Sequence, residues 1–373
     1  MEDPNTPQKA LLVLSDGTVF SGTAFGKKGT TIGEICFNTS MTGYQEMLSD
    51  PSSFGQIIVS TNSHAGNYGC KKDEQMSSGG SASGFVCRNF SGHYSRAQGD
   101  SSLSAFMEDH NIIGISGIDT RALVRKIRKV GTMDAVISSR VLEVEDLKGM
   151  LKNKGSDNGL NVVEDVSIDA SFNVGNENSM YRIAVIDFGT KQKVLDLLTE
   201  RGAYLRVFSA NSDYQEMKDW NPDAFLLSGG PGDPNKMGGA IELAGNLIED
   251  GRPVFGICLG HQLLALASGL QVKKLTPGDR GANQPVLNVI TGRGEITAQN
   301  HGFGVDRKEI EQNPIVEITH FNLNNDTVEG LRWKGKGIFS VQFHPEGAAG
   351  PHDSRYLFDD FISEIKEYKQ VKV

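Results

Sequence analysis

Short apolar runs alternate with amphipathic stretches through the second half of the chain. The runs are rich in Val, Ile, Leu and Phe, which is typical of strands buried on both faces of a parallel sheet. The stretches between them carry apolar residues at helical spacing, as crossover helices do. This alternation predicts a doubly wound, mostly parallel α/β sheet with strands at residues 183–188, 204–208, 224–228 and 253–257.

The first half of the chain has strand-like runs separated by glycine-rich turns and two helical patterns. These features predict a separate N-terminal α/β domain at residues 1–150. Residues 151–180 are polar, Asn-rich and unpatterned, as expected of a linker, and the second domain then occupies residues 181–373. The strands expected in the first domain are 10–14, 34–38, 56–60, 84–87 and 112–115, and the helices are 102–110 and 119–129.

Composition narrows the class of protein. The chain of 373 residues is long enough for two domains, and its net charge of −9 argues against a nucleic-acid partner. No apolar run approaches the roughly eighteen residues needed to span a bilayer, and the acidic, polar N-terminus does not resemble a secretory signal. The four cysteines form no C-x-x-C pair, which indicates free thiols in a reducing cytoplasm and argues against a metal site.

Cys258 lies between two glycines, after an apolar run and before a helix-like run. The order Gly256-Ile-Cys-Leu-Gly260 is typical of a nucleophile elbow, in which a strand turns sharply into a helix and only small neighbours fit. The positive end of the helix that follows favours an anion, so it stabilises a thiolate. An isolated cysteine is more often a small buried hydrophobe, which is how we interpret Cys36 and Cys87.

A second motif, His344-Pro-Glu346, ends the apolar strand expected at residues 337–343. Alternation along an extended chain would send His344 and Glu346 to the same side, and Pro345 stiffens the link between them. A thiol, a histidine to take its proton and a carboxylate to orient the histidine make a covalent acyl-transfer site.

The loop 228–234, Ser-Gly-Gly-Pro-Gly-Asp-Pro, follows another predicted strand. It lacks the Lys-Ser/Thr of a P-loop and the spacing of a dinucleotide fingerprint, so phosphate binding is disfavoured. Amides near Gly230 and Leu259 could instead point at the oxygen of a tetrahedral intermediate. A plain tight turn is the alternative.

These motifs resemble those of the class I (triad) glutamine amidotransferases. The resemblance extends through residues 37–46 and 50–52, Phe-Asn-Thr-Ser-Met-Thr-Gly-Tyr-Gln-Glu and Asp-Pro-Ser, which are similar to the N-terminal domain of the carbamoyl-phosphate synthetase small chain. Segments 117–121, 298–303 and 319–323 resemble the same family, and the similarity covers residues 10–365.

The resemblance implies roles for individual residues. Cys258 would attack the side-chain amide of glutamine, His344 would carry the proton to the leaving ammonia, and Glu346 would orient His344. Gly230 and Leu259 would serve the oxyanion. The positions that would hold glutamine are Ser52, Gly232, Gln262, Asn300, Gly302 and Phe303. Because Ser52 belongs to the N-terminal domain, the resemblance places the pocket between domains.

The resemblance also implies a division of labour. A large synthetase chain would bind ATP, Mg²⁺ and bicarbonate, and this chain would need no cofactor or metal of its own. Its expected partners are L-glutamine and that large chain, with no nucleic acid and no membrane. Two alternatives remain open: a catalytically silent assembly or regulatory subunit, and an ammonia donor to a different synthase.

The chain departs from the family pattern at Asp279 and Gln284, where the family commonly has histidine. Residues 190–193 also differ slightly from the family's usual helix start, and we expect Thr190 to cap a helix that runs to Arg201. Three other histidines compete with His344 for the role of base. His261 is expected to face away from the thiol, and His301 and His320 lack a carboxylate at the right spacing in sequence.

Overall fold

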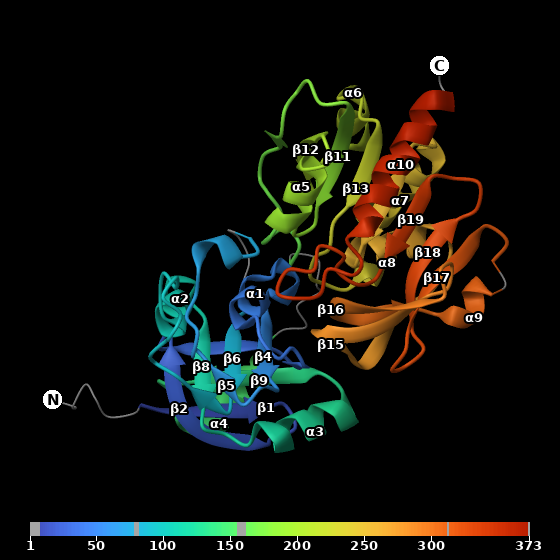
Figure 1. Ribbon diagram of the computed structural model, residues 1–373. Coiled ribbons are helices and arrows are strands. Elements are labelled where there is room, and N and C mark those ends of the chain that lie inside the picture. Colours follow the sequence, from blue (N-terminus) through green and yellow to red (C-terminus); the bar gives the residue numbers. More distant parts are fainter. Residues whose placement is uncertain (1–7, 78–81, 155–161, 312, 372–373) are drawn as a thin grey trace. The chain divides into compact units, whose positions relative to one another are not determined.

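The computed structural model describes residues 8–77, 82–154, 162–311 and 313–371 (Figure 1). The chain divides into two compact units, Met1–Asp157 and Asn158–Val373. Residues 155–161, part of the expected linker, lie outside the described residues. Within the described part of the chain, no helix is both long enough and apolar enough to cross a membrane.

The first unit is built on a closed barrel of short strands. Strands β3, β4, β6 and β8 pair in parallel, and β1, β2 and β9 close the barrel through antiparallel pairs. In barrel order the strands are β1 (Lys9–Leu14), β2 (Val19–Gly26), β8 (Ile113–Ser116), β6 (Gly84–Cys87), β4 (Gln56–Ser60), β3 (Thr30–Asn38) and β9 (Met133–Ser138). The expected strands are present, but β2, β9 and the closure of the sheet were not predicted.

Helices pack against both faces of the barrel strands. Leu12 and Leu14 of β1 join a buried cluster with residues from other strands and from α3, whereas Leu11 and Val13 pack with α4. The alternation along β1 therefore buries both of its faces. The remaining elements of the unit are α1 (Tyr44–Ser49), η1 (Pro51–Ser53), β5 (His64–Ala65), η2 (Lys72–Glu74), β7 (Asn89–Phe90), α2 (Leu103–Asp109), α3 (Thr120–Val130) and α4 (Val144–Asn153).

The second unit contains one large mixed sheet. Its parallel part, β12-β11-β13-β14-β19, matches the expected doubly wound sheet, and an antiparallel part continues from β19. In sheet order the strands are β10 (Phe172–Val174), β12 (Ala203–Ser209), β11 (Tyr181–Asp187), β13 (Ala224–Leu227), β14 (Val254–Ile257), β19 (Ile338–Val341), β18 (Val328–Trp333), β17 (Val316–Asn322), β15 (Val272–Asn288) and β16 (Arg293–Val305).

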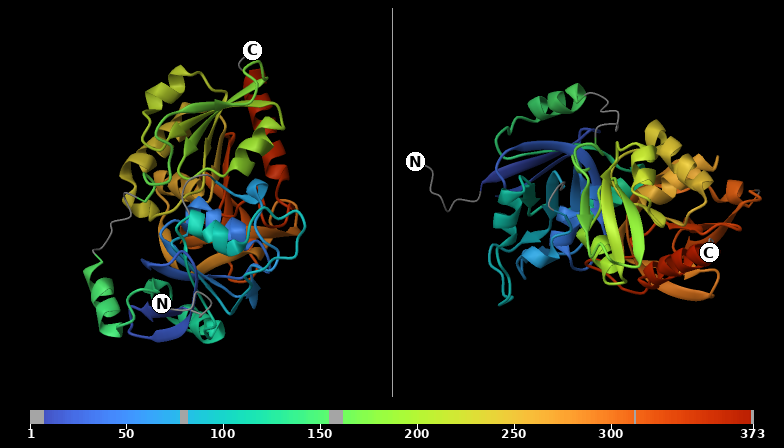
Figure 2. Two further views of the ribbon diagram at one scale, coloured as in Figure 1. Left: turned by 90° about the vertical axis from the view of Figure 1, so that its left-hand side faces the viewer. Right: turned by 90° about the horizontal axis from the view of Figure 1, so that it is seen from above.

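Helices lie on both faces of the parallel strands. Ile183 and Val185 of β11 pack in a cluster with α5 and α10, whereas the alternating residues Ala184 and Ile186 pack with α6, α7 and α8. Figures 1 and 2 show α10 on one side of this sheet and α7 on the other. The helices are α5 (Gln192–Thr199), α6 (Tyr214–Asp219), η3 (Pro234–Lys236), α7 (Gly238–Asp250), α8 (Leu259–Ala267), α9 (Arg307–Ile310) and α10 (Tyr356–Val371).

Two local expectations were wrong. Thr190 does not cap α5: the cap residue is Lys191, and the loop before it is held by Asp187, whose Oδ1 accepts from the amides of Gly189 and Thr190. Residues 172–174, inside the expected linker, form β10 and pair antiparallel with β12. A strand this short has no periodicity from which it could be recognised.

Candidate active site

The Cys258 elbow joins β14 to α8. Cys258 has φ 51° and ψ −100°, a strained backbone conformation for a residue with a side chain. A Cβ on Gly256 would lie 2.6 Å from Leu264 Cδ1, and one on Gly260 would overlap the Leu227 carbonyl oxygen. Both glycines are therefore required so that α8 can turn back closely on β13 and β14.

The thiol of Cys258 is almost fully buried among three backbone segments. Its Sγ lies 3.9 Å from the carbonyl oxygen of Asn300 on β16, and Gln342 Nε2 donates to it at 3.7 Å. A Cβ built on Gly229 would lie 3.5 Å from Cys258 Cβ and 3.1 Å from His344 Cε1. The structure thus places the thiol and the His344 imidazole together beside Gly229.

His344 is held in place at both its backbone and its ring. Its amide donates to the Ala298 carbonyl on β16 at 2.8 Å, and Nδ1 lies 3.0 Å from Glu346 Oε1. The two residues do not alternate along a strand: β19 ends at Val341, and a turn closed by the Gly347 amide on the His344 carbonyl returns Glu346 to the imidazole. The expected contact is present, but the reason given for it was wrong.

A third charge joins this pair. Lys191 Nζ lies 3.1 Å from Glu346 Oε1 and 3.1 Å from His344 Nδ1, and all three side chains are buried. Both the ammonium and an Nδ1–H can donate to the Glu346 carboxylate. The Glu346 carboxylate favours a proton on Nδ1, and Nε2 is then the ring atom available to the thiol.

The neighbouring charges shift the pKa values of His344 and Glu346 in opposite directions. Burial and Lys191 lower the pKa of His344, but the Glu346 carboxylate and the Cys258 sulfur outweigh them and raise it above its ordinary value. Burial would raise the pKa of Glu346, yet Lys191 and His344 together hold it well below its ordinary value. The site therefore favours an imidazolium next to a carboxylate.

The oxyanion role expected of the Leu259 and Gly230 N–H groups stays a prediction, and the structure shows how the backbone is held at each residue. Leu259 is the first residue of α8, so its N–H has no acceptor within the helix. Gly230 follows Gly229 in a loop anchored by Ser228, whose carbonyl accepts from the Gly260 amide at 3.1 Å. A Cβ on Gly230 would overlap the Phe188 carbonyl oxygen, and Gly232 has φ 108°, so both positions require glycine.

The predicted glutamine positions fall on two structural units. Asn300, Gly302 and Phe303 lie on β16 in the second unit, and Gln262 Nε2 donates to the Phe303 carbonyl at 3.1 Å and to Gln342 Oε1 at 3.0 Å. Ser52 lies in η1 of the first unit, where it is buried. Its Oγ has no hydrogen-bond partner among the described residues. The role of Ser52 in glutamine binding stays a prediction.

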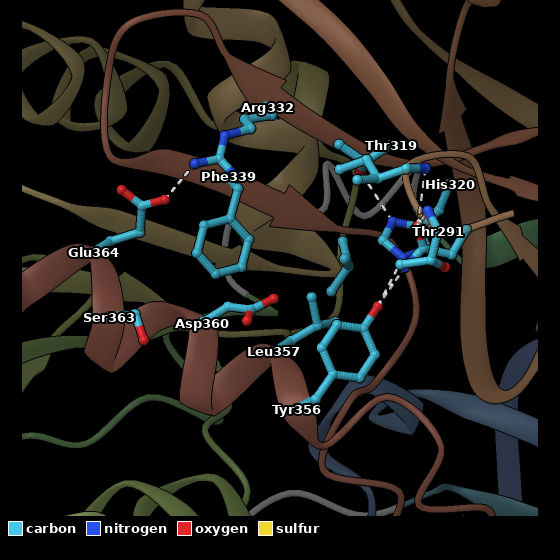
Figure 3. A pocket seen from close by; sticks show the side chains of 13 residues that line it. Thr291, Thr319, His320, Arg332, Phe339, Tyr356, Leu357, Asp360, Ser363 and Glu364 are labelled. Carbon is cyan, nitrogen blue, oxygen red and sulfur yellow. Dashed lines mark hydrogen bonds and ion pairs between the residues drawn. The ribbon is translucent and has the colours of Figure 1, made fainter. Parts of the chain in front are cut away.

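The competing histidines are engaged elsewhere. His261 is fully buried in α8 with Nδ1 2.8 Å from Ser340 Oγ, and burial lowers its pKa to about 3. His320 lines a cavity of about 230 Å³ beside α10, where its Nε2 is 3.3 Å from the Tyr356 hydroxyl and Arg332 pairs with Glu364 (Figure 3). None of Cys258, His344 and Glu346 lines this cavity.

His301 differs from the expectation in one respect. Its Nε2 lies 4.0 Å from Glu329 Oε1, so it does have a carboxylate neighbour, which comes from a distant strand that sequence spacing could not reveal. Its Nδ1 is 2.8 Å from the Phe303 carbonyl, and the ring therefore makes no interaction with the thiol among those described.

Sequence reasoning missed Lys191, Gly229 and Gln342 as site residues. Gly229 and Gln342 stand inside motifs that had been singled out, so proximity to the motif was the available signal. Lys191 had no such signal, because a lysine at the start of a helix is ordinary and only the fold brings it to Glu346.

The chain was compared with known proteins. Residues 12–137 match the family model "Carbamoyl-phosphate synthase small chain, CPSase domain", and residues 184–364 match "Glutamine amidotransferase class-I". The carbamoyl phosphate synthase small chain of Clostridium acetobutylicum is 44% identical over 360 residues, covering 95% of this chain and 99% of that protein.

Two further relatives bear the same name. The protein of Synechococcus sp. is 42% identical, with 98% of this chain and 96% of that protein covered. The protein of Rhodopirellula baltica is 42% identical, with 97% and 98% covered. On this near full-length similarity, the chain belongs to the carbamoyl-phosphate synthase small-chain family, with a class I glutamine amidotransferase domain in its second half.

Proposed function

We propose that this chain is the glutaminase subunit of a carbamoyl-phosphate synthase, which hydrolyses glutamine through a thioester on Cys258 and delivers ammonia to a large synthetase chain. One observation carries the chemical part: Cys258 and His344 lie together beside Gly229, with Glu346 3.0 Å from the imidazole. Membership of the family supplies the substrate class and the partner.

In the first half-reaction the Cys258 thiolate attacks the side-chain amide carbon of glutamine. A C–S bond forms, and the electron pair of the carbonyl π bond moves to oxygen, where the N–H groups of Gly230 and Leu259 stabilise the negative charge. The His344 imidazolium donates its Nε2 proton to the amide nitrogen, the C–N bond breaks, and ammonia leaves a γ-glutamyl thioester on Cys258.

In the second half-reaction water replaces ammonia. Neutral His344 accepts a proton at Nε2 as the water oxygen attacks the thioester carbon, and the C–S bond then breaks to release glutamate and the thiolate. Glu346 and Lys191 serve both steps, because they keep the Nδ1 proton in place and the ring in one orientation.

The remaining chemistry belongs to the partner in this proposal. ATP, Mg²⁺ and bicarbonate are assigned to the large chain, and this chain contributes no cofactor. The cysteine usage and the net charge of −9 support a cytoplasmic protein that binds glutamine and another protein rather than nucleic acid.

The test uses the complex with the large chain and compares the wild type with Cys258→Ser. Glutamine-dependent synthesis of carbamoyl phosphate should disappear in the variant, and synthesis from added ammonia should continue. Equal glutamine-dependent rates would exclude Cys258 as the nucleophile and favour a silent assembly subunit. Glutamine hydrolysis stimulated by a different synthase, and not by this large chain, would favour the other ammonia-donor alternative.

A glutamine-analogue electrophile gives an independent readout. It should label Cys258 and spare the buried thiols Cys36, Cys70 and Cys87. Burial raises the pKa of Cys70 and of Cys87 to about 12, which keeps both as unreactive thiols.

A further inference from the structure

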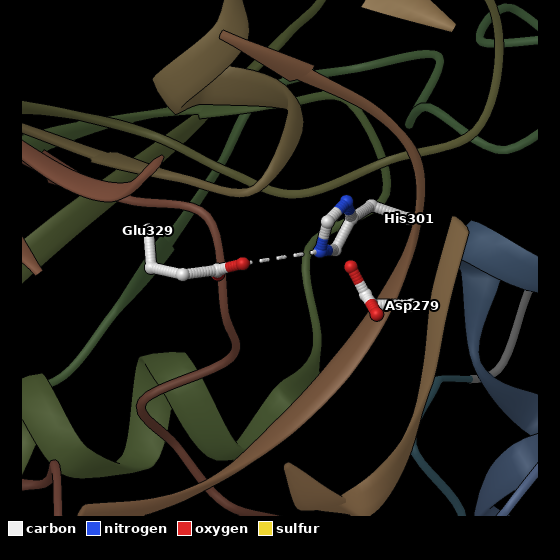
Figure 4. A group of neighbouring side chains, drawn as sticks. All are labelled: Asp279, His301 and Glu329. Atoms are coloured by element: carbon white, nitrogen blue, oxygen red, sulfur yellow. Dashed lines mark ion pairs between the residues drawn. The ribbon is translucent and has the colours of Figure 1, made fainter. Parts of the chain in front are cut away.

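Three potential metal ligands that are not part of the Cys258, His344 and Glu346 set converge in the antiparallel part of the second unit. Asp279 of β15 and His301 of β16 are directly paired across the two strands, and Glu329 comes from β18 (Figure 4). One ligand atom from each residue can be chosen so that all lie within 4.8 Å of one another. The set contains no cysteine, so the spacing of the cysteines could not have indicated it.

The surroundings of His301 are the first argument for a bound cation. A backbone carbonyl can only accept, so the 2.8 Å approach of Nδ1 to the Phe303 carbonyl places a proton on Nδ1. The ring is buried, and Nε2 is its remaining atom that could coordinate an ion. Nε2 faces two side-chain oxygen atoms, Gln299 Oε1 at 2.5 Å and Glu329 Oε1 at 4.0 Å.

Glu329 supplies a second, independent argument. Its side chain is completely buried, and Oε2 has no hydrogen-bond partner in the described part of the chain. Oε1 accepts from the Thr327 hydroxyl at 2.9 Å. A buried carboxylate oxygen without a partner is costly, and the cost falls when a cation coordinates it.

The neighbours of the other two ligands are those that metal sites use to orient them. The Phe303 carbonyl holds the His301 ring through Nδ1, and Asn325 Nδ2 donates to Asp279 Oδ1 at 3.0 Å and to Oδ2 at 2.9 Å. Asp279 is the half-buried member of the set, so it can move, and it stands where the family commonly has histidine. The site is therefore argued from this chain and not from its relatives.

We propose that Asp279, His301 and Glu329 bind a divalent transition-metal ion of the Zn²⁺ class, with water completing the coordination. One imidazole nitrogen and two carboxylates suit zinc, whereas Mg²⁺ and Ca²⁺ prefer oxygen alone. Ligand atoms at about 2.0–2.2 Å from a zinc ion are roughly 3–3.5 Å from one another. The ligand atoms of the three side chains must therefore move about 1 Å closer together when the ion binds. The ion would join β15, β16 and β18 next to Asn300 and Gly302.

The test measures Zn²⁺ binding to the full chain in a Cys258→Ser background, which removes the reactive thiol as a competing ligand. After chelation and dialysis, isothermal titration should show one tight equivalent of Zn²⁺ per chain, and the melting temperature should rise with the metal. Asp279→Asn should weaken this binding at least tenfold. Glu329→Gln should also weaken Zn²⁺ binding at least tenfold. If Glu329→Gln does not fold, the result for Asp279→Asn decides the test.

Asp326→Asn is the matched control, because Asp326 is exposed and paired with Arg307 and has φ 60°, which asparagine tolerates. Its Zn²⁺ affinity should equal that of the Cys258→Ser parent. Absence of a tight equivalent, or unchanged affinity in Asp279→Asn, overturns the proposal. Either result would mean that the Gln299 amide is turned to donate to His301 and that the cluster is a hydrogen-bonded one.

Discussion

Gly229 faces the two side chains on which the proposed chemistry depends, and it has no side chain of its own to displace them. A methyl group there would stand 3.1 Å from His344 Cε1, closer than most Cβ contacts allow. We expect Gly229→Ala to lower kcat for glutamine hydrolysis at least tenfold, since displacements of about 1 Å can cost about 10²-fold. Steady-state kinetics of the complex measure this.

The control for this variant is Gly245→Ala. Gly245 lies inside α7, and a Cβ there would meet nothing within 4 Å. The control should keep full activity and gain up to about 1 kcal/mol of stability, because alanine is the better helix former. Full activity in Gly229→Ala would remove the reason for placing the reacting groups beside this glycine.

We expect the buried charge of Lys191 to contribute to the stability of the fold. It is a buried cation 3.1 Å from the Glu346 carboxylate, which has His344 as its other charged neighbour. Removing one member of a buried pair typically costs about 3–5 kcal/mol, and the remaining histidine should reduce this to about 2–3 kcal/mol for Lys191→Met. Urea denaturation measures the loss.

Lys193→Met serves as the comparison. Lys193 is partly exposed and lies 3.5 Å from the exposed Glu200, so its replacement should change the free energy of unfolding by less than about 1 kcal/mol. Equal losses in the two variants would show that the Lys191 charge has no special place in the buried network.

The pKa shifts of Glu346 and His344 set the pH range in which the triad stabilises the fold. The pKa of Glu346 is lowered by folding, so its contribution is present above the ordinary value of 4.5 and is lost as the pH falls. The pKa of His344 is raised, so its contribution is complete below 6.5 and declines as the pH rises toward its folded value. Both contributions are therefore full between these two values.

The variant Glu346→Gln tests the predicted direction of this pH dependence of stability. The difference in free energy of unfolding between the wild type and Glu346→Gln should be greatest between pH 4.5 and 6.5 and should shrink as the pH falls further. Denaturant titrations at a series of pH values measure it. A difference that grew toward acid pH would contradict the ion-pair description.

At the scale of elements, the elbow depends on close contact between α8 and β13. A Cβ on Gly260 would lie 2.7 Å from Leu227 Cβ and would overlap the Leu227 carbonyl oxygen, so Gly260→Ala must push α8 away. We expect a loss of about 1–3 kcal/mol of stability, together with loss of glutamine hydrolysis. Thermal unfolding and glutaminase assays measure these two effects.

Gly238→Ala is the matched change at the start of another helix. Gly238 begins α7, and a Cβ there would meet nothing within 4 Å, so stability and activity should be retained. If Gly260→Ala behaved like this control, the tight strand-to-helix turn would not be what positions Cys258.

The elements also show which parts of the fold the sequence could predict. The parallel strands and their helices were predicted because each is a local pattern of apolar residues: the run 183–188 appears as β11 and the run 224–228 as β13. The long strands β15 and β16 were not predicted from the sequence. Register shifts at Lys274/Asp279 and Gly281/Gln284 interrupt the alternation of apolar and polar residues along them.

The same distinction holds for the candidate site. The triad residues lie in two contiguous motifs, and the sequence suffices to propose them. Lys191 and the Asp279, His301 and Glu329 set are brought into place only by the packing of distant segments. A single sequence contains no local signal for a contact between strands as far apart in the chain as β16 and β18.

At the scale of the whole molecule, the proposed reaction requires a partner, because ammonia released without an acceptor would waste glutamine. We expect the isolated chain to hydrolyse glutamine slowly and the large chain to accelerate it, by aligning the groups around Cys258. Glutamate release by the chain alone and by the complex measures this. Equal rates would remove the argument for activation by the partner.

A substitution of Ser52 tests whether the first unit contributes to glutamine binding, since Ser52 belongs to the first unit and the thiol to the second. Its hydroxyl is buried, and no partner is found for it among the described residues, so it contributes little to stability. If it contacts glutamine as the family resemblance implies, Ser52→Ala should raise KM for glutamine about tenfold or more and leave the free energy of unfolding nearly unchanged.

Ser49 is a control on the neighbouring helix. Its Oγ donates to the Gln45 carbonyl at 2.9 Å and accepts from the Met76 amide at 3.1 Å, so its hydroxyl is committed to the fold of the first unit. Ser49→Ala should therefore destabilise the chain by about 1–3 kcal/mol, because buried partners lose their hydrogen bonds, and should leave KM unchanged. Kinetics of the complex and urea denaturation separate the two outcomes. Unchanged KM in Ser52→Ala would confine glutamine recognition to the second unit.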